Sequence, residues 1–218
     1  MAEATLTISS RNYSSWSLRG WLICRMVGLD FETAVVSGAD ASIRAELLLL
    51  SPSFLVPRLD HGGISVWDTL AIAEYLNESY PQAGLLPEPP VERARCRSVS
   101  GEMHGGFINL RSALPMNLRA LHHGFKVFNG AKGDIERICT IFEDCLSRSG
   151  GPFLFGPKPT LADAMYAPVC TRFRTYDVRL PFTADTYKDT ILAWDLMTEW
   201  TEAAAGEPEE IQELDMEF

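Results

Sequence analysis

The chain has 218 residues, 46% apolar and 22% charged, which is ordinary for a globular protein with one large domain or two small ones. Its formal net charge is −10, and no basic run is present, so the composition argues against a nucleic-acid partner. No apolar stretch approaches the roughly 18 residues that span a bilayer, and no signal-peptide pattern opens the chain. We therefore expect a cytoplasmic protein that does not interact with membranes.

The first half of the chain predicts alternating strands and helices. A strand is expected at 6–9, a helix that ends at Gly28, and a second strand at 31–36. A helix over 41–50 follows, then a hairpin of strands 56–60 and 64–67, and a helix over 69–80. The first two strands should pair in parallel and the hairpin strands antiparallel, so this order predicts a mixed, thioredoxin-like sheet.

The second half predicts helices alone, after a proline-rich linker at 81–90. We expect helices over 91–122 with an interruption near Pro115, over 134–148, from Thr160 onwards, and as a final pair over 184–205. Thr160 and Asp163 form a capping-box pattern before a mostly apolar helix. The organisation expected is an α/β domain at 1–81, a linker at 82–91 and an all-helical domain at 92–218.

The five cysteines are expected to be reduced thiols. They are odd in number, widely spaced, and contain no C-x-x-C pair. The four histidines also lack the spacing of metal ligands, because neighbours such as His122 and His123 point in different directions on a helix. We therefore expect no metal site.

Ser14 and Ser15 lie on the turn between the first predicted strand and helix. The first N–H groups of a helix have no intrahelical partner and favour an anion. A hydroxyl that donates to a thiolate contributes about 1.5–3 kcal/mol, enough to lower a thiol pKa of about 8.5 by one to two units. The turn therefore suits a thiolate, although a capping role for each serine is the alternative.

A second polar pair, Asp68 and Thr69, opens the helix after the hairpin. Its carboxylate can meet a ligand ammonium, while the hydroxyl and the free N–H groups of the helix receive a ligand carboxylate. A plain helix cap is the alternative here as well.

In this order and spacing, the motifs resemble the cytosolic glutathione transferase family over nearly the whole chain. The run SSWSLR at 14–19 is similar to the serine motif of the zeta class. The resemblance implies a thioredoxin-like α/β N-terminal domain and an all-α C-terminal domain, the glutathione transferase fold. It also implies that Ser14 activates the glutathione thiol, with Ser15 beside it in the site.

The same resemblance assigns further glutathione contacts. Val56 and Pro57 match the family's cis-proline, whose preceding residue offers backbone groups to the cysteinyl part of glutathione. Asp68 and Thr69 match the pair that holds the γ-glutamyl end. No position matches a partner for the glycine carboxylate, for which Arg11 is a candidate by charge, as is Arg58.

Two departures from the family pattern stand close to these motifs. Trp16 occupies the position of the zeta-class cysteine, which weakens an assignment to the isomerase of that class. Phe54 and Leu55 replace a glycine and a polar residue that family members commonly carry before the proline.

The second substrate is expected to lie against the helical domain. His104, Phe107, Ile108 and Arg111 fall at helical spacing, and Arg172 lies on the helix expected to be buried. Core packing is the alternative for the apolar pair, and pairing with acidic residues is the alternative for the arginines. If the arginines face the serine turn, we expect an anionic acceptor, because the guanidinium fork suits carboxylates.

The sequence thus predicts an enzyme that uses glutathione, as substrate or cofactor, on a small electrophilic molecule by conjugation, isomerisation or reduction. The alternative is a non-catalytic, glutathione-transferase-like protein that binds ligands or regulates a partner. A thioredoxin-type oxidoreductase is disfavoured, because the turn carries serines instead of C-x-x-C. The family resemblance also implies a homodimer.

Overall fold

The computed structural model describes residues 4–36 and 55–208. The helix expected over 41–50 and the side chain of Phe54 lie outside these ranges. Within them, the N-terminal part contains four strands: β1 (Ala4–Ile8), β2 (Phe31–Val35), β3 (Arg58–His61) and β4 (Ile64–Trp67). Two helices belong to it, α1 (Ser15–Met26) and α3 (Thr69–Ser79).

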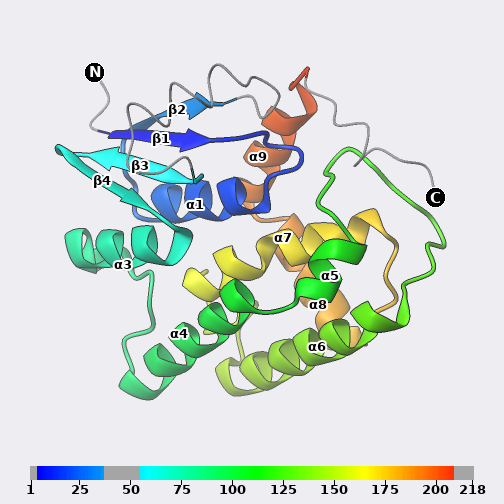
Figure 1. Cartoon of the computed structure of the whole chain (residues 1–218). Helices are drawn as coiled ribbons and strands as arrows, with labels where there is room; N and C mark the ends of the chain where they lie inside the picture. Colours follow the sequence, from blue (N-terminus) through cyan, green and yellow to red (C-terminus); the bar gives the residue numbers. More distant parts are fainter. Residues whose placement is uncertain (1–3, 37–54, 209–218) are drawn as a thin grey trace.

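The four strands form one mixed sheet in the order β2-β1-β3-β4. β1 pairs with β2 in parallel and with β3 antiparallel, and β3 pairs with β4 antiparallel. The mixed thioredoxin-like sheet predicted from the sequence is therefore confirmed. Figure 1 shows α1 and α3 on the same side of the sheet, the side that faces the helices of the second half.

The second half is helical. After a short 3-10 turn (η1, Pro81–Ala83), it contains α4 (Pro90–Gly105), α5 (Ile108–Ala113), α6 (Asn129–Ser149), α7 (Leu161–Thr175), α8 (Phe182–Leu192) and α9 (Asp195–Ala205). The capping box that opens α7 is present, and buried Asp163 also accepts hydrogen bonds from the Leu154 amide and the Tyr187 hydroxyl. No helix in the described ranges is long and apolar enough to cross a membrane.

The helix predicted over 91–122 is interrupted before Pro115, as expected, but it is also broken at Gly106 and does not resume after Pro115. The α4 helix ends at Gly105, Gly106 is extended, and Phe107 has a left-handed backbone with φ of 58°. The short α5 therefore starts with a new direction, and the chain beyond Leu114 forms no helix before α6. The Gly105-Gly106 pair is the physical reason, because glycine has low helix propensity and permits the extended break.

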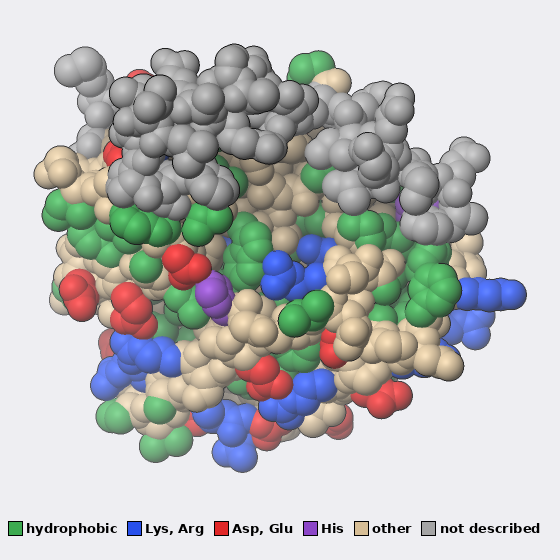
Figure 2. All heavy atoms as spheres, viewed as in Figure 1, with side chains coloured by type: hydrophobic (Ala, Val, Ile, Leu, Met, Phe, Trp, Pro, Cys, Tyr) green, Lys and Arg blue, Asp and Glu red, His purple; other side chains and the backbone are tan. Residues whose placement is uncertain are grey.

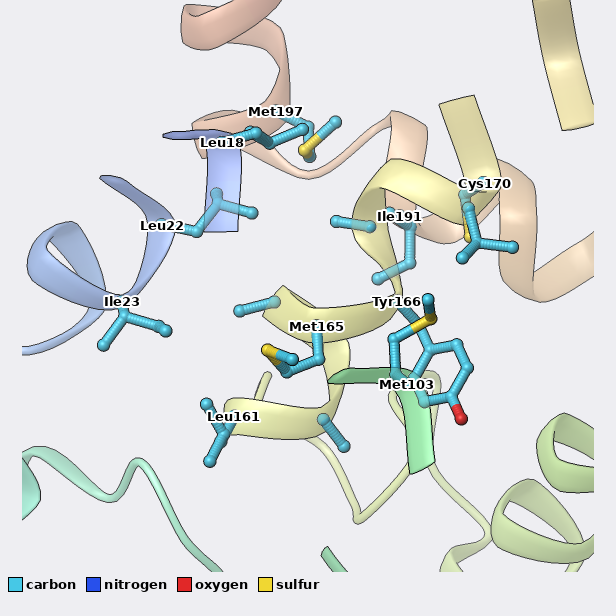
Figure 3. Close-up of a cluster of buried hydrophobic side chains, with 14 of the residues drawn as sticks. Leu18, Leu22, Ile23, Met103, Leu161, Met165, Tyr166, Cys170, Ile191 and Met197 are labelled. Atoms are coloured by element: carbon cyan, nitrogen blue, oxygen red, sulfur yellow. The ribbon is translucent and has the colours of Figure 1, made fainter. Parts of the chain in front are cut away.

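The two halves share one continuous hydrophobic core. Figure 3 shows Leu18 and Leu22 of α1 near the α7 side chains around Met165, with Met197 of α9 closing the cluster. Because α1 packs directly against the buried α7, the turn that begins α1 is held at the junction of the two halves.

Candidate active site

Ser14 is the N-cap of α1. Its hydroxyl oxygen accepts the Ser17 amide at 3.2 Å, and its proton is donated to the Ser17 hydroxyl at 2.8 Å. The Ser17 hydroxyl also accepts the Ser9 amide at 3.1 Å. The capping alternative is thus observed for Ser14. A hydroxyl has one proton and two lone pairs, so Ser14 can keep the amide bond while its own proton turns toward a ligand.

Ser15 is the first residue of α1 and is 7% exposed. Its hydroxyl makes no hydrogen bond to another residue that the structure describes. The first turn of α1 carries no acidic side chain, so the partial positive charge of this helix end is uncompensated there. Both serines therefore stand where an anion is stabilised.

A cavity of about 520 Å³ opens between the serine turn and the helical domain. Its lining residues are Tyr13, Ser14, Ser15, Trp16, Ile108, Arg111, Ser112, Pro115, Met116 and Arg172. Figure 2 shows Lys or Arg side chains in a hollow near the centre of this face, beside α5. The cavity thus joins the two serines to Ile108, Arg111 and Arg172, three of the five residues expected to contact a second substrate.

Phe107 does not line this cavity. Its side chain is buried in the core against Tyr166, with ring centroids 6.4 Å apart. The helix break at 106–107 turns Phe107 inward, while Ile108, 67% exposed, begins α5 on the cavity side. Phe107 is therefore a core residue, which was the alternative to a place in the substrate pocket. The helical spacing on which the pocket prediction rested does not continue through Gly106.

A larger cavity of about 720 Å³ lies beside α6, between the segments around Phe125 and Val178. It contains no residue of the serine turn. The smaller cavity is the better candidate because it combines hydroxyls, a helix N-terminus and cationic side chains.

Arg19 is buried directly behind the serine turn. Its Nε donates to the Met165 carbonyl at 2.7 Å and its Nη1 to the Ser15 carbonyl at 3.2 Å. Burial, reinforced by Arg172 and Arg111, lowers the pKa of Arg19 well below its ordinary value. The two hydrogen bonds to carbonyls hold the Arg19 side chain beneath the first turn of α1.

Arg172 extends this positive region to the cavity wall. It is 4% exposed and donates to the carbonyls of Leu114 and Arg111. Burial and the nearby Arg111 lower its pKa to about 10. No carboxylate in the described ranges lies within ion-pair distance of Arg19, Arg111 or Arg172, so the cluster lacks the counter-ion that buried charges normally have.

Trp16 lies among these cations. Its ring centroid is 4.6 Å from the Arg19 Cζ and 4.8 Å from the Arg111 Cζ, and 5.1 Å from the His104 ring. Cation–π contacts of this kind contribute about 0.5–2 kcal/mol each. The sequence did not predict these cation–π contacts, because Trp16 stood out there only as a departure from the family pattern.

Asp68 caps α3 from a left-handed backbone position with φ of 74°. Its Oδ1 accepts the Leu70 amide at 2.9 Å, and its Oδ2 lies 2.6 Å from the His104 Nε2. His104 therefore links α4 to Asp68 and does not line the cavity. A non-glycine residue at positive φ is uncommon, which makes Asp68 a candidate for function beyond capping.

Thr69 is 1% exposed, and its hydroxyl is buried without a hydrogen-bond partner in the described ranges. The glutathione contact that the resemblance implies for Thr69 stays a prediction. Only its backbone, at the start of α3, is in a position typical of anion contacts.

The Val56–Pro57 peptide bond is cis, as the resemblance implies. Pro57 is buried against α1, where an ideal Cβ on Gly20 would lie 2.6 Å from the Pro57 Cβ. Gly20 therefore permits the close approach that brings this loop beside the serine turn. In the sequence, the sign of this close approach is a glycine inside a helical pattern.

Arg11 and Arg58 both have carboxylate partners. Arg11 pairs with Glu207 at 3.2 Å, and Arg58 pairs with Asp60 at 2.9 Å. To bind the glycine carboxylate of glutathione, either arginine would have to share its guanidinium with the carboxylate that it already contacts.

Comparison with known proteins agrees with this architecture. The model of the glutathione S-transferase N-terminal domain matches residues 13–79, and that of the C-terminal domain matches 103–205. The chain is 30% identical to the maleylacetoacetate isomerase of Rhizobium meliloti (strain 1021), over 77% of this chain and 81% of that protein. It is also 30% identical to glutathione S-transferase 1 of Dianthus caryophyllus, over 75% of each. The chain therefore belongs to the glutathione S-transferase family.

Solved structures share the same fold. A maleyl pyruvate isomerase, described as a bacterial glutathione S-transferase in the zeta class, superposes with a TM-score of 0.72 at 24% identity over 95% of this chain and 100% of that one. The maleylacetoacetate isomerase of Anaeromyxobacter dehalogenans 2CP-1 gives a TM-score of 0.66 at 24% identity, over 96% and 99%. The expected pairing of a thioredoxin-like half with an all-helical half is thus confirmed.

Proposed function

We propose that this protein is a glutathione-dependent enzyme that acts on a small, electrophilic and anionic molecule. The observation that carries the proposal is the shared cavity, in which Ser14 and Ser15 face Arg111 and Arg172. One side of the cavity suits a thiolate, and the other suits a carboxylate.

Glutathione would lie along the N-terminal half, with its thiol at the serine turn. Its cysteinyl backbone would pair with Val56, and its γ-glutamyl end would approach Asp68. Ser14 would donate its hydroxyl proton to the thiolate, and the N-terminus of α1 would add a favourable field. Together these groups favour ionisation of the thiol, which creates the nucleophile.

The acceptor would enter from the α5 side of the cavity. Arg111 and Arg172 lack carboxylate partners in the described ranges, and a carboxylate on the acceptor would supply the missing counter-ion. The bound thiolate would then attack the electrophilic carbon of the acceptor. This attack breaks the C=C π bond of an unsaturated acceptor and leaves its electron pair on an enolate. In a transfer reaction the enolate takes a proton from solvent and the C–S bond remains. In an isomerisation the enolate rotates about the former double bond, re-forms it and expels the thiolate.

Relatives support both outcomes. Matches named maleylacetoacetate isomerase and maleylpyruvate isomerase favour isomerisation of a carboxylate, and a match named glutathione S-transferase 1 favours transfer. The relatives with isomerase names also weaken the argument that Trp16 separates this chain from that class.

The decisive experiment combines binding and turnover. Calorimetry with glutathione should show a saturable site, and turnover should be faster with a cis-unsaturated carboxylate than with a neutral electrophile of similar reactivity. Absence of glutathione binding would refute the proposal. Binding without turnover of either acceptor would favour the non-catalytic, ligand-binding alternative.

We also propose a homodimer in the cytoplasm. Leu55, Ile64 and Trp67 are 55%, 51% and 38% exposed, and such apolar surface suits an interface. Sedimentation at micromolar concentration should give twice the mass of the 24.2 kDa chain.

The five cysteines are all free, which fits a reducing compartment.

A further inference from the structure

Glu207 lies just beyond the end of α9, yet its carboxylate reaches the loop that leads to Ser14. One oxygen accepts the Ser10 hydroxyl at 2.9 Å, and the Arg11 amide lies 2.9 and 2.8 Å from the two oxygens. The Asn12 amide at 3.3 Å and the Arg11 Nη1 at 3.2 Å complete the contacts. The Glu207 side chain is 11% exposed, so these bonds are shielded from water.

The loop that Glu207 binds, residues 9–14, belongs to no strand or helix. Successive backbone N–H groups in such a turn form a concave anion site, which Glu207 fills from within the chain. Ser10 is also tied directly to the serine turn, because its carbonyl accepts the Ser14 amide at 3.0 Å. A carboxylate that fixes Ser10 therefore fixes the backbone of Ser14.

The segment that carries Glu207 is itself anchored. The Glu207 carbonyl accepts the Arg119 Nη1 at 3.0 Å, and the Trp200 Nε1 on α9 donates to the Arg11 carbonyl at 3.0 Å. Figure 1 shows α9 beside the sheet, near the start of α1. The C-terminal helix thus acts as a fixed support for the loop.

The opposite side of the loop is held by Asn12. Its Oδ1 accepts the Leu118 amide at 2.8 Å, and its Nδ2 donates to the Asn117 Oδ1 at 3.0 Å. These two side-chain bonds do not involve Glu207, so removal of the carboxylate should loosen the loop without releasing it altogether.

We infer that Glu207 is a positioning residue for the serine turn, which holds Ser14 in the orientation that stabilises the thiolate of bound glutathione. This role rests on the proposed function of the turn. A purely electrostatic role would have the opposite sign, because an anion near the turn disfavours a thiolate. Loss of positioning should raise the pKa of the bound thiol, whereas loss of charge alone should lower it.

The test compares Glu207→Ala, Glu207→Gln and a control, Glu202→Ala, in the full chain. Glu202 is an exposed acid on α9, the helix that ends just before Glu207. Glutamine removes the charge but keeps one acceptor oxygen for the Arg11 amide. Each variant is saturated with glutathione and its pH is varied while the ultraviolet absorbance of the thiolate is followed, which gives the pKa of the bound thiol. Amide hydrogen exchange is measured over residues 10–17.

With Glu207→Ala, we expect the pKa of the bound thiol to rise by about one unit and kcat/KM at pH 6.5 to fall about tenfold. Glu207→Gln should lose less than about threefold, and Glu202→Ala should match the wild type. Exchange over 10–17 should be faster in Glu207→Ala than in the control. Should the alanine variant fail to fold, the same comparison is made with Glu207→Asp, which shortens the reach by one methylene.

An unchanged or lower thiol pKa in both Glu207 variants would overturn the inference. If the wild type binds no glutathione, the proposed function fails, and hydrogen exchange alone decides the placement of the turn. Exchange no faster in Glu207→Ala than in Glu202→Ala would then refute the positioning role.

Discussion

Replacement of Ser14 by alanine separates its two functions, the helix cap and the donor to the thiolate. Alanine removes the acceptor of the Ser17 amide at 3.2 Å, so the free energy of unfolding should fall by about 1 kcal/mol. Loss of one charge-assisted hydrogen bond to the thiolate, worth about 1.5–3 kcal/mol, should reduce turnover about ten- to 150-fold at neutral pH. The two losses are measured independently, by urea titration and by steady-state kinetics.

The pH dependence gives the sharper readout. Ser14 stabilises the charged form of the thiol, so its loss should raise the pKa of bound glutathione by about one to two units. The deficit in rate should be largest below the wild-type pKa and should close at pH values above the pKa of the variant, where both thiols are ionised. Ser98→Ala, at an exposed serine of α4, is the control and should change neither quantity.

Ser15→Ala decides between the two serines. Because the Ser15 hydroxyl lacks a described protein partner, its removal should cost little stability. Full activity of Ser14→Ala together with loss of activity in Ser15→Ala would refute the assignment to Ser14 and move the donor one residue along the chain.

Two further predictions concern the cavity and its support. Arg111→Gln and Arg172→Gln should each raise the KM of a carboxylate acceptor about tenfold more than that of a neutral electrophile, because each removes a charged donor to the anion; equal effects on both acceptors would contradict an anionic substrate. Gly20→Ala should lower the free energy of unfolding by about 1–3 kcal/mol in urea titrations, because the new Cβ would meet the Pro57 ring at 2.6 Å. In the control Gly101→Ala, the added Cβ meets no atom within 4 Å, so this change should instead stabilise α4 by about 0.5–1 kcal/mol. Equal destabilisation by Gly20→Ala and Gly101→Ala would contradict the packing argument.

Local patterns in the sequence were sufficient for the four described strands and for most of the described helices. Strand 31–36, the hairpin around Gly62 and the capping box at Thr160 depend on neighbours within a few residues, and the structure has each of them. The serine turn was found for the same reason, since a strand, two hydroxyls and a helix follow one another directly. The long helix predicted over 91–122 failed because apolar periodicity continues past Gly105 and Gly106, although the backbone does not.

Only the tertiary structure decided which residues share the site. Arg172 follows Ser14 by more than 150 residues, and its place in the cavity depends on how α7 packs against α1. The sequence likewise could not show that Glu207 bonds to Ser10, or that Asp68 bonds to His104. Each of these bonds joins segments far apart in the chain. Short-range patterns determine local backbone form, whereas the burial of charge and the pairing of distant polar groups are fixed only when the two halves pack together.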